Sequence, residues 1–582
     1  MSDYDLVIRN GVIIDGSGNA GFKADVAVRA GLIVGVGEIA GVGAEEIDAE
    51  GRLVTPGFVD IHTHYDGQAT WEHRMAPSSA HGVTTVLTGN CGVGFAPCRA
   101  EHRQSLVELM EGVEDVPEVV MTEGLSWKWQ SFPDYLDFLG ARQFDVDIAT
   151  QLPHSCLRVY VMGERGVRRE QATENDLKEM RRLTREAIEA GALGVGTSRS
   201  MFHNFPDGRP VPTKDAGEAE LASLAAGVND AGGGVLQGLL DLNRLETEFP
   251  LLQRVASGAG LPASFTLAQT VMEPEVWRRA LSLLDEANAC GTQMRGQIIA
   301  RPTGILLGLD LTVNPFSRHP GFQQFAGLPL AEKVAHLRKP EVRAAILAES
   351  PADWDHPVQK FASLFEKMYP LGDPPNYEPD PEMSVAGRAI AGGVSPKEIA
   401  YDLLLEDDGH AVLFVAVANY VDGNLDSALE LARHPHTILG LGDGGAHYGL
   451  ICDAGYPTFM LTYWTRDRST GERMSVPEVV KALSHDTASA VGLSDRGLIA
   501  PGYKADLNII DYDRLHVHAP RVKFDLPAGG RRITQAASGY AVTIVSGIVT
   551  YRDGEPTGAL PGRLVRGPTE RVSAGWPTMS GA

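Results

Sequence analysis

The chain has 582 residues, of which 43% are hydrophobic and 22% charged, a composition typical of a globular protein rather than a disordered one. Its 75 acidic and 51 basic residues give a formal net charge of −24, which weighs against nucleic acid or an anionic membrane as a partner. The five cysteines are few, odd in number and mostly far apart, unlike a secreted disulfide framework. With no leader-like start and no run long enough to span a bilayer, the sequence predicts a cytoplasmic protein and leaves a homo-oligomer open.

Both ends of the chain contain short segments in which apolar and polar residues alternate, separated by Gly, Asn and Asp. Asp5–Arg9 is an example near the start, and residues 542–545 repeat the style near the end. Such segments are typical of hairpins in a small sheet. We therefore expect one β-sandwich domain built from residues 1–55 and 495–567, followed by a tail at 568–582.

Between these ends, strand-like apolar runs alternate with long amphipathic stretches, the pattern of βα units on a parallel sheet. The candidate strands are 57–61, 84–88, 146–151, 193–197, 234–238, 263–268, 293–299, 412–417 and 437–442. These are nine candidates for eight places, and 412–417 is the most expendable because it follows a long insertion. The predicted fold is α/β, a (β/α)8 TIM-type barrel over residues 56–494 with an insertion at about 301–409. That insertion is either a lid or substrate wall, or a solvated excursion.

The most informative motif is His62-Thr63-His64, which follows the apolar run 56–61. Residues i and i+2 of a strand project from the same face, so both imidazoles can aim at one point, as a divalent metal requires. An isolated His-x-His is common by chance and is then usually a surface or hydrogen-bonded pair. Here Asp443 follows the late strand candidate 437–442 in the same way. Together these strand-end residues indicate a metal hydrolase of the barrel type.

Cys91 follows the β-branched run 83–88, so we expect its thiol at the same rim as His62. A small buried cysteine usually serves only in packing, but a thiolate beside imidazoles suits zinc. Asp443 has two candidate roles, as a metal ligand and as the catalytic group that accepts the proton of metal-activated water. The alternative for Asp443 is a turn residue in a Gly-rich loop.

The stretches 56–64, 82–92, 442–447 and 497–507, together with the amino-terminal strands, resemble the amidohydrolase superfamily. The Asn-Cys-Gly motif around Cys91 looks like the N-acyl-D-amino-acid deacylase (D-aminoacylase) branch. The resemblance extends from the first strand to about Gly567. It implies a metal-bearing (β/α)8 barrel with a small β-sandwich, and hydrolysis of a linear amide into a carboxylic acid and an amine such as an amino acid.

Residue by residue, the resemblance implies that His62 and His64 are the first-strand ligands, Cys91 the cysteine ligand and Asp443 the last-strand aspartate. The family also places one metal-binding histidine on each of barrel strands five and six, but this chain has no histidine between His203 and His319. We therefore expect one zinc ion rather than two. Glutamine is a poor zinc ligand, so the glutamines in the aligned stretches are predicted to contact substrate or water. They are Gln237 and Gln269.

Other polar residues follow strand ends and are weaker substrate-binding candidates. They are His154, Arg301, Asn419 and His447. Arg301 is considered for a bidentate contact with a substrate carboxylate. Two further His-x-His pairs receive no role. His434 and His436 precede the last strand at the stability face of the barrel, and His516 and His518 fall in the terminal β domain.

The sequence thus predicts a metal-dependent hydrolase acting on a small-molecule amide, an N-acyl amino acid or a relative of one. One alternative is a cyclic-amide hydrolase or deaminase on the same fold. Cyclic-amide members of the superfamily typically use a carboxylated lysine on a barrel strand, and none of the strand candidates contains a lysine. The other alternative is a degenerate barrel that serves in binding or assembly, which the missing histidines favour. That protein would hold no stoichiometric metal and would not depend on Asp443.

Overall fold

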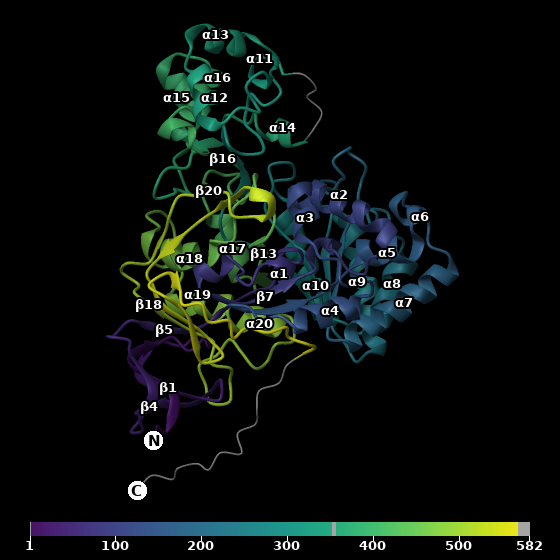
Figure 1. Cartoon of the computed structure of the whole chain (residues 1–582), viewed down its shortest axis with the longest axis vertical. Helices are drawn as coiled ribbons and strands as arrows, with labels where there is room; N and C mark the ends of the chain where they lie inside the picture. The colour runs from purple at the N-terminus through teal and green to yellow at the C-terminus, as the bar shows by residue number, and fades with distance from the viewer. Residues whose placement is uncertain (1, 352–356, 569–582) are drawn as a thin grey trace.

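The computed structural model describes residues 2–351 and 357–568, so residues 569–582 of the expected tail lie outside the described residues. Figure 1 shows three parts. Strands from both ends of the chain lie at the bottom of the view, a body of strands and helices lies in the middle, and a helical lobe lies at the top. The described residues include no helix with the length and apolar character needed to cross a bilayer.

A nine-stranded sheet combines both ends of the chain. Its strands are β1 (Tyr4–Ile13), β2 (Phe22–Arg29), β3 (Leu32–Gly37), β4 (Gly43–Asp48), β5 (Leu53–Pro56), β18 (Leu507–Ile510), β23 (Tyr540–Val545), β24 (Ile548–Arg552) and β25 (Glu555–Pro556). Antiparallel pairing of β5 with β18 joins the early strands to the late ones. Side chains such as Ile8, Val26 and Ile544 form a core of this sheet's own. Burial of these branched residues stabilises the pairing of two segments that are distant in sequence.

The central body is built on parallel strands in two groups, three in one and six in the other. They are β6 (Phe58–Asp60), β7 (Val83–Thr88) and β8 (Asp147–Thr150), then β9 (Leu152–Pro153), β10 (Gly194–Ser198), β11 (Val235–Leu239), β12 (Ala263–Thr266), β13 (Met294–Ile298) and β17 (Thr437–Leu439). Only Gln151 separates β8 from β9, so together they occupy one strand position. The strands are buried, as expected for a sheet covered by helices.

Helices follow most of these strands and cover them. The longer ones in the body are α2 (Arg103–Glu114), α4 (Phe132–Gly140), α5 (His154–Met162), α7 (Glu174–Glu189), α8 (Glu218–Asp230), α9 (Leu245–Ala259), α10 (Val276–Ala289), α17 (Asp426–Arg433) and α19 (Val476–Leu483). The start of α7 is fixed by a capping box, in which Thr173 accepts from the Asp176 N–H and Asp176 reaches back. A similar box at Ser475 starts α19. These caps fix the residue at which each helix begins.

The insertion forms the upper lobe of Figure 1. The predicted surplus strand 412–417 is found as β16 (Leu413–Ala418), which pairs antiparallel with β14 (Thr303–Leu307) and β15 (Met368–Pro370), apart from the parallel strands. Around this sheet lie α11 (Pro320–Gln323), α12 (Leu330–Leu337), α13 (Pro340–Ala348), α14 (Pro357–Phe361), α15 (Val385–Gly392) and α16 (Pro396–Leu404). The lobe has its own apolar core, which includes Phe316, Val334 and Leu413. It is therefore a packed unit rather than a loose excursion.

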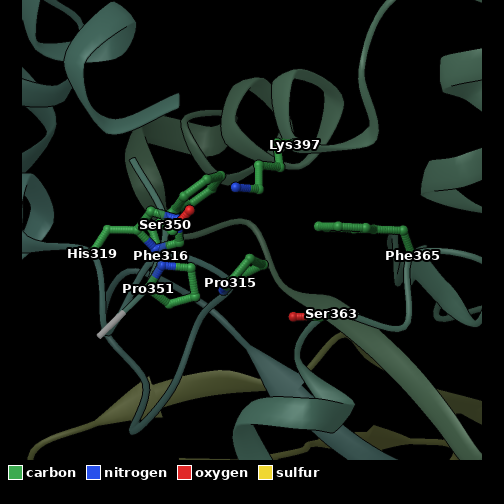
Figure 2. Close-up of a pocket in the computed structure, with 8 residues that line it drawn as sticks. All are labelled: Pro315, Phe316, His319, Ser350, Pro351, Ser363, Phe365 and Lys397. Carbon is green, nitrogen blue, oxygen red and sulfur yellow. The ribbon is translucent and has the colours of Figure 1, made fainter. Parts of the chain in front are cut away.

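A cavity of about 470 Å³ lies within this lobe (Figure 2). Its walls are mostly apolar, with Phe316 and Phe365 as the largest side chains, and Lys397 extends across its rim. All of its lining residues belong to the insertion. It is therefore separate from the strand ends that carry the predicted metal ligands.

Candidate metal centre

The two histidines of the first strand leave β6 side by side. The loop that carries them is held against β7, because the backbone N–H and the hydroxyl of Thr63 both donate to the Leu87 carbonyl. With Thr63 turned toward β7, His62 and His64 face the other way, and their ring centroids lie 5.5 Å apart. Both side chains are buried. The local backbone therefore aims two imidazoles at one region, as the i, i+2 spacing predicts.

Cys91 completes a group of three metal-ligand atoms. It lies in a short turn after β7 with a positive φ of 55°, which places its Sγ atom 3.3 Å from His62 Nε2. The ligand atoms of His62, His64 and Cys91 all lie within 4.8 Å of one another, and all three residues are buried. Burial raises the pKa of the Cys91 thiol to about 12, although His64 acts in the opposite direction. A divalent cation would displace that thiol proton.

Asp443 enters the group from the far end of the chain. Two backbone hydrogen bonds join its loop to the histidine loop, from Asp443 N–H to the His62 carbonyl at 3.0 Å and from His64 N–H to the Gly444 carbonyl at 2.8 Å. They place Asp443 Oδ1 3.5 Å from His62 Nε2 and 3.7 Å from His64 Nε2. Burial would raise the pKa of Asp443, but His64 and His62 outweigh it and hold that pKa well below its usual range. Asp443 is therefore an anion that faces both rings.

His62 is held in one orientation by a residue of β13 that the sequence analysis did not single out. Gln297 Oε1 lies 2.7 Å from His62 Nδ1, and the Gln297 amide nitrogen donates to Ser264 Oγ at 3.0 Å. Because the amide nitrogen is committed to Ser264, the amide oxygen faces the ring and accepts its Nδ1 proton. Nε2 of His62 is then the nitrogen left for a metal.

His64 is held by Glu114, the last residue of α2 and one with no recognisable motif around it. The buried Glu114 carboxylate lies 3.4 Å from His64 Nδ1 and 3.3 Å from His447 Nε2. Burial raises the pKa of Glu114 to about 7, with His64 opposing that rise. For His64, burial would lower the pKa, but Glu114 and Asp443 outweigh it and hold the pKa well above its ordinary value. Glu114 thus leaves Nε2 of His64 directed at Asp443.

These residues open into a cavity of about 730 Å³. Its walls come from the ends of the parallel strands, from the end of α2 and from the insertion, which contributes residues such as Gln323, Gln359 and Phe361. Among the described lining residues, Arg318 is the one lysine or arginine. His203 also lines the cavity, and its Nδ1 lies 2.9 Å from Ser198 Oγ. Burial and the neighbouring His447 lower the pKa of His203 to about 3, so it is neutral near neutral pH.

The cavity wall from β11 and β12 differs from the wall that carries the histidines. Its lining residues include Leu239, Thr266 and Ala268, none of which is a good zinc ligand. Gln237 of β11 turns toward Cys91 and accepts its backbone N–H at 3.2 Å. The ligand atoms that converge are those of His62, His64 and Cys91, whereas Asp241, which lines the cavity beyond β11, is paired with Lys214 at 3.1 Å.

Of the four weaker substrate-binding candidates, His447 alone lines the cavity, and Gln269, paired with Gln237 in the sequence analysis, does not. His154 contacts Thr197 and Glu220 at 2.8 and 2.9 Å. Arg301 pairs with Asp453 at 2.6 Å and lies over the Tyr377 ring. Asn419 holds backbone in place, because it donates to the Ile299 and Arg301 carbonyls. Gln269 is also committed, donating to Asp422 and accepting from the Ser427 hydroxyl.

The fold and the site define a mixed α/β protein with a separate sheet domain and a histidine, cysteine and aspartate centre at the ends of parallel strands. The chain belongs to the amidohydrolase family, whose sequence profile matches residues 45–551. Along the sequence it is 24% identical over 575 residues to the N-acyl-D-glutamate deacylase of Alcaligenes xylosoxydans xylosoxydans, covering 97% of this chain and 96% of that protein.

Two solved structures share the fold. A D-aminoacylase, described as having a binuclear metal centre with one-metal activation and second-metal attenuation, superimposes with a TM-score of 0.65 at 22% identity, covering 97% of this chain and all of that one. The N-acyl-D-glutamate deacylase of Bordetella bronchiseptica, solved with zinc and a phosphonate mimic of the tetrahedral intermediate, gives 0.64 at 21% identity, covering 97% and 99%.

Proposed function

We propose that this chain is a metal-dependent hydrolase that cleaves the linear amide of an N-acyl amino acid with a D-amino acid on the amine side. The observation that carries the proposal is the convergence of His62, His64 and Cys91 on one point, with Asp443 facing them in a cavity. The deacylase relatives, which are named for D-amino acid substrates, support the choice of substrate class.

The residues fit a zinc ion by their donor chemistry. Two imidazoles, one thiol and one carboxylate are a ligand set that zinc prefers, and both ring nitrogens of the buried His64 lack a hydrogen-bond partner within the described structure. When bound, the metal supplies Lewis-acid chemistry, polarising the amide carbonyl and activating water near neutral pH. His62, His64 and Cys91, with the Asp443 carboxylate, would hold it, while Gln297 and Glu114 keep the rings oriented.

Asp443 moves the proton in this proposal. Its carboxylate remains ionised, because its pKa lies well below the usual range. It accepts a proton from the attacking water at Oδ1 and delivers it to the nitrogen of the departing amine. The side chain is 20% exposed, so it is open to the cavity where the substrate amide would lie.

Arg318 is the proposed partner of the substrate carboxylate. It reaches the cavity from the insertion and has no ion-pair or hydrogen-bond partner among the described residues, whereas Arg301 is occupied by Asp453. A guanidinium can bind a carboxylate through two parallel hydrogen bonds. The apolar wall at Leu239, Leu240 and Ala268 suits the acyl chain.

We further propose a single zinc ion, since the end of β12 offers Thr266 and Ala268 rather than ligands, and Asp241 beyond β11 is paired with Lys214. The eight strand positions are proposed to close into a (β/α)8 barrel, and the two hydrogen bonds between the loops after β6 and β17 support closure.

We also propose the domain bounds that the sequence predicts, with residues 1–55 and 495–567 forming one domain around residues 56–494. A cytoplasmic location is supported by the five free cysteines of the described residues.

Zinc content and hydrolysis test the proposal together. Wild type is expected to hold zinc and to release free amino acid from a panel of N-acetyl-D- and N-acetyl-L-amino acids, with the D series preferred. His62→Ala and Cys91→Ala should lose both zinc and hydrolysis. Hydrolysis that continues undiminished in His62→Ala would refute the mechanism. A wild type with no hydrolysis of any amide, and no zinc lost in these variants, would favour the binding-barrel alternative.

A further inference from the structure

A second group of metal-ligand atoms lies outside the cavity described above. Asp373, His516 and His518 each offer one ligand atom, and the three atoms lie within 4.8 Å of one another. Both histidines are half-buried and Asp373 is exposed. Two imidazoles and one carboxylate are first-row transition-metal ligands, and an open side leaves room for water to complete the coordination.

The two histidines share a face because they flank one residue of a strand. His516 belongs to β19 (His516–Val517), which pairs antiparallel with β22 (Ala537–Ser538). His518 is fixed beyond the strand end on both sides of its peptide, since its N–H donates to the Ala536 carbonyl at 3.0 Å and its carbonyl accepts from Gln535 Nε2 at 2.8 Å. Val517 between them is buried. The rings therefore turn outward together, with centroids 5.0 Å apart.

Asp373 comes from a different part of the chain, the loop after β15 in the insertion. Its Oδ1 accepts the Ala519 N–H at 3.3 Å, which brings the carboxylate beside His518. The preceding loop is anchored by the Leu371 N–H, which donates to the Val412 carbonyl at 3.1 Å. Both contributing segments are thus held by backbone hydrogen bonds, so the ligand atoms are brought together without any metal.

The site lies where the insertion meets residues 516–538, which run from β19 to β22 and are called the carboxy-terminal segment below. In Figure 1 that segment, in yellow with β20 (Arg521–Lys523), reaches the base of the upper lobe near β16. Ion pairs between Arg521 and Asp407 and between Arg531 and Asp310 link the same two parts. Exposed pairs of this kind contribute little, typically below about 1 kcal/mol each. A shared metal would therefore be a stronger link between the two parts.

The same three residue types also meet at His434, His436 and Asp285, which provides an internal comparison. There each histidine reaches the carboxylate, at 3.3 and 3.7 Å, but the ring centroids are 5.7 Å apart. Among the described residues, that trio does not bring all three ligand atoms within 4.8 Å of one another. Composition alone therefore does not produce convergence, and the Asp373 group is distinguished by its geometry.

We propose that Asp373, His516 and His518 form a second site for a divalent transition metal, with zinc as the probe, which clamps the insertion to the carboxy-terminal segment. The site takes no part in hydrolysis, and the proposal does not depend on the proposed function. Binding to the folded chain alone stabilises it in proportion to the logarithm of the free zinc concentration. Loss of one imidazole ligand should weaken zinc binding by more than the roughly 10- to 100-fold that removal of a partner outside the ligand set costs.

The experiment uses the full chain, freed of metal with a chelator and dialysed against zinc at a series of free concentrations. His518→Ala and Asp373→Asn should bind one equivalent fewer than wild type and lose the zinc-dependent rise in unfolding temperature that this equivalent produces. Asp373→Asn is nearly isosteric and exposed, so it keeps the test valid if His518→Ala does not fold. His434→Ala is the matched control and should behave as wild type.

Equal zinc stoichiometry in wild type, His518→Ala and Asp373→Asn would overturn the proposal, as would an equal loss in His434→Ala. His62→Ala separates this outcome from the fate of the candidate metal centre. An equivalent that persists in His62→Ala but disappears in Asp373→Asn supports the clamp site, whether or not the chain hydrolyses amides.

Discussion

Two buried histidine clusters lie at the ends of parallel strands in this molecule. They differ in whether the ring nitrogens of the central histidine have hydrogen-bond partners. His154 has a partner on each ring nitrogen, Thr197 at 2.8 Å and Glu220 at 2.9 Å, and Glu220 also pairs with Arg158. His64, by contrast, has no hydrogen-bond partner on either ring nitrogen within the described residues, although carboxylates lie 3.4 and 3.7 Å away. The first cluster is closed, and the second opens into a cavity.

This difference separates structure from function among residues of the same type. An unsatisfied buried polar group costs about 1 to 3 kcal/mol, so a fold that keeps several of them together retains them for a ligand that the chain itself does not supply. In the cluster around His154 the polar groups bond to one another, and these contacts stabilise the fold. The comparison predicts that substitutions at the two clusters affect different measurements.

The largest expected effect is on hydrolysis at the open cluster. Asp443→Asn should lower kcat roughly a thousandfold, because the amide cannot accept the proton from water. The lowered pKa of Asp443 means that its carboxylate also stabilises the fold, so the unfolding curve is needed to show that Asp443→Asn is still folded at the assay temperature. Steady-state kinetics and calorimetry of both proteins check this. Full activity in Asp443→Asn would remove the distinction between the clusters.

At the closed cluster the expected effect is on stability. Glu220→Gln should destabilise the fold by about 3 kcal/mol, because it leaves the buried Arg158 without its charge partner. Zinc content should be unchanged. Denaturant unfolding measures the loss of stability. Glu218→Gln is the matched control, because Glu218 lies on the same helix as Glu220 but forms an exposed ion pair, with Arg254. A loss of zinc with no loss of stability would contradict the assignment of roles.

The same carboxylate gives a pH signature. Burial by itself raises the pKa of Glu220, but His154 and Arg158 outweigh it and lower the pKa to about 2 from an unfolded value of 4.5. A lowered folded pKa means that the stabilisation is complete above pH 4.5 and is lost as the pH falls from 4.5 toward 2. Unfolding curves across this range should show a smaller acid-induced loss in Glu220→Gln than in wild type. Parallel curves would contradict the shift.

A smaller effect is expected from the residue that orients His64. Glu114→Gln should weaken zinc binding by about 10- to 100-fold, the usual cost of removing an orienting partner of a metal-binding histidine. Glu111→Gln, one turn earlier on α2 and also lining the cavity, should bind zinc as wild type does. Chelator competition measures both affinities. Equal affinities in the two variants would mean that Glu114 does not position His64.

The smallest effect concerns substrate recognition. Arg318→Ala should raise KM by about tenfold for N-acyl amino acids, because one charge-assisted contact is lost, with kcat little changed. The corresponding amino acid amides lack the carboxylate and should show no such change. Arg301→Lys is the contrasting variant, since Arg301 is committed to Asp453, and it should affect stability rather than the choice between acids and amides.

The sequence by itself determined the parts of this protein that depend on local pattern. Alternating and continuous apolar runs marked the terminal strands and the parallel strands, because burial on one face or both imposes those patterns. The i, i+2 spacing of His62 and His64 and the strand-end position of Cys91 placed three ligand atoms in one region. Among the nine strand candidates, the place of 412–417 after a long insertion made it the most expendable, and its pairing with β14 and β15 agrees with that expectation.

Only the tertiary structure decided which polar side chains meet. Glu114 and Gln297 approach the histidines from α2 and β13, and nothing in their local sequence marks them, because the contact depends on how distant elements pack. The same packing pairs Arg301 with Asp453, so Arg301 is not available to a substrate. It places Arg318, which local sequence did not mark, at the cavity. Local spacing fixes the direction in which a side chain points, whereas its partner is set by the arrangement of the whole chain.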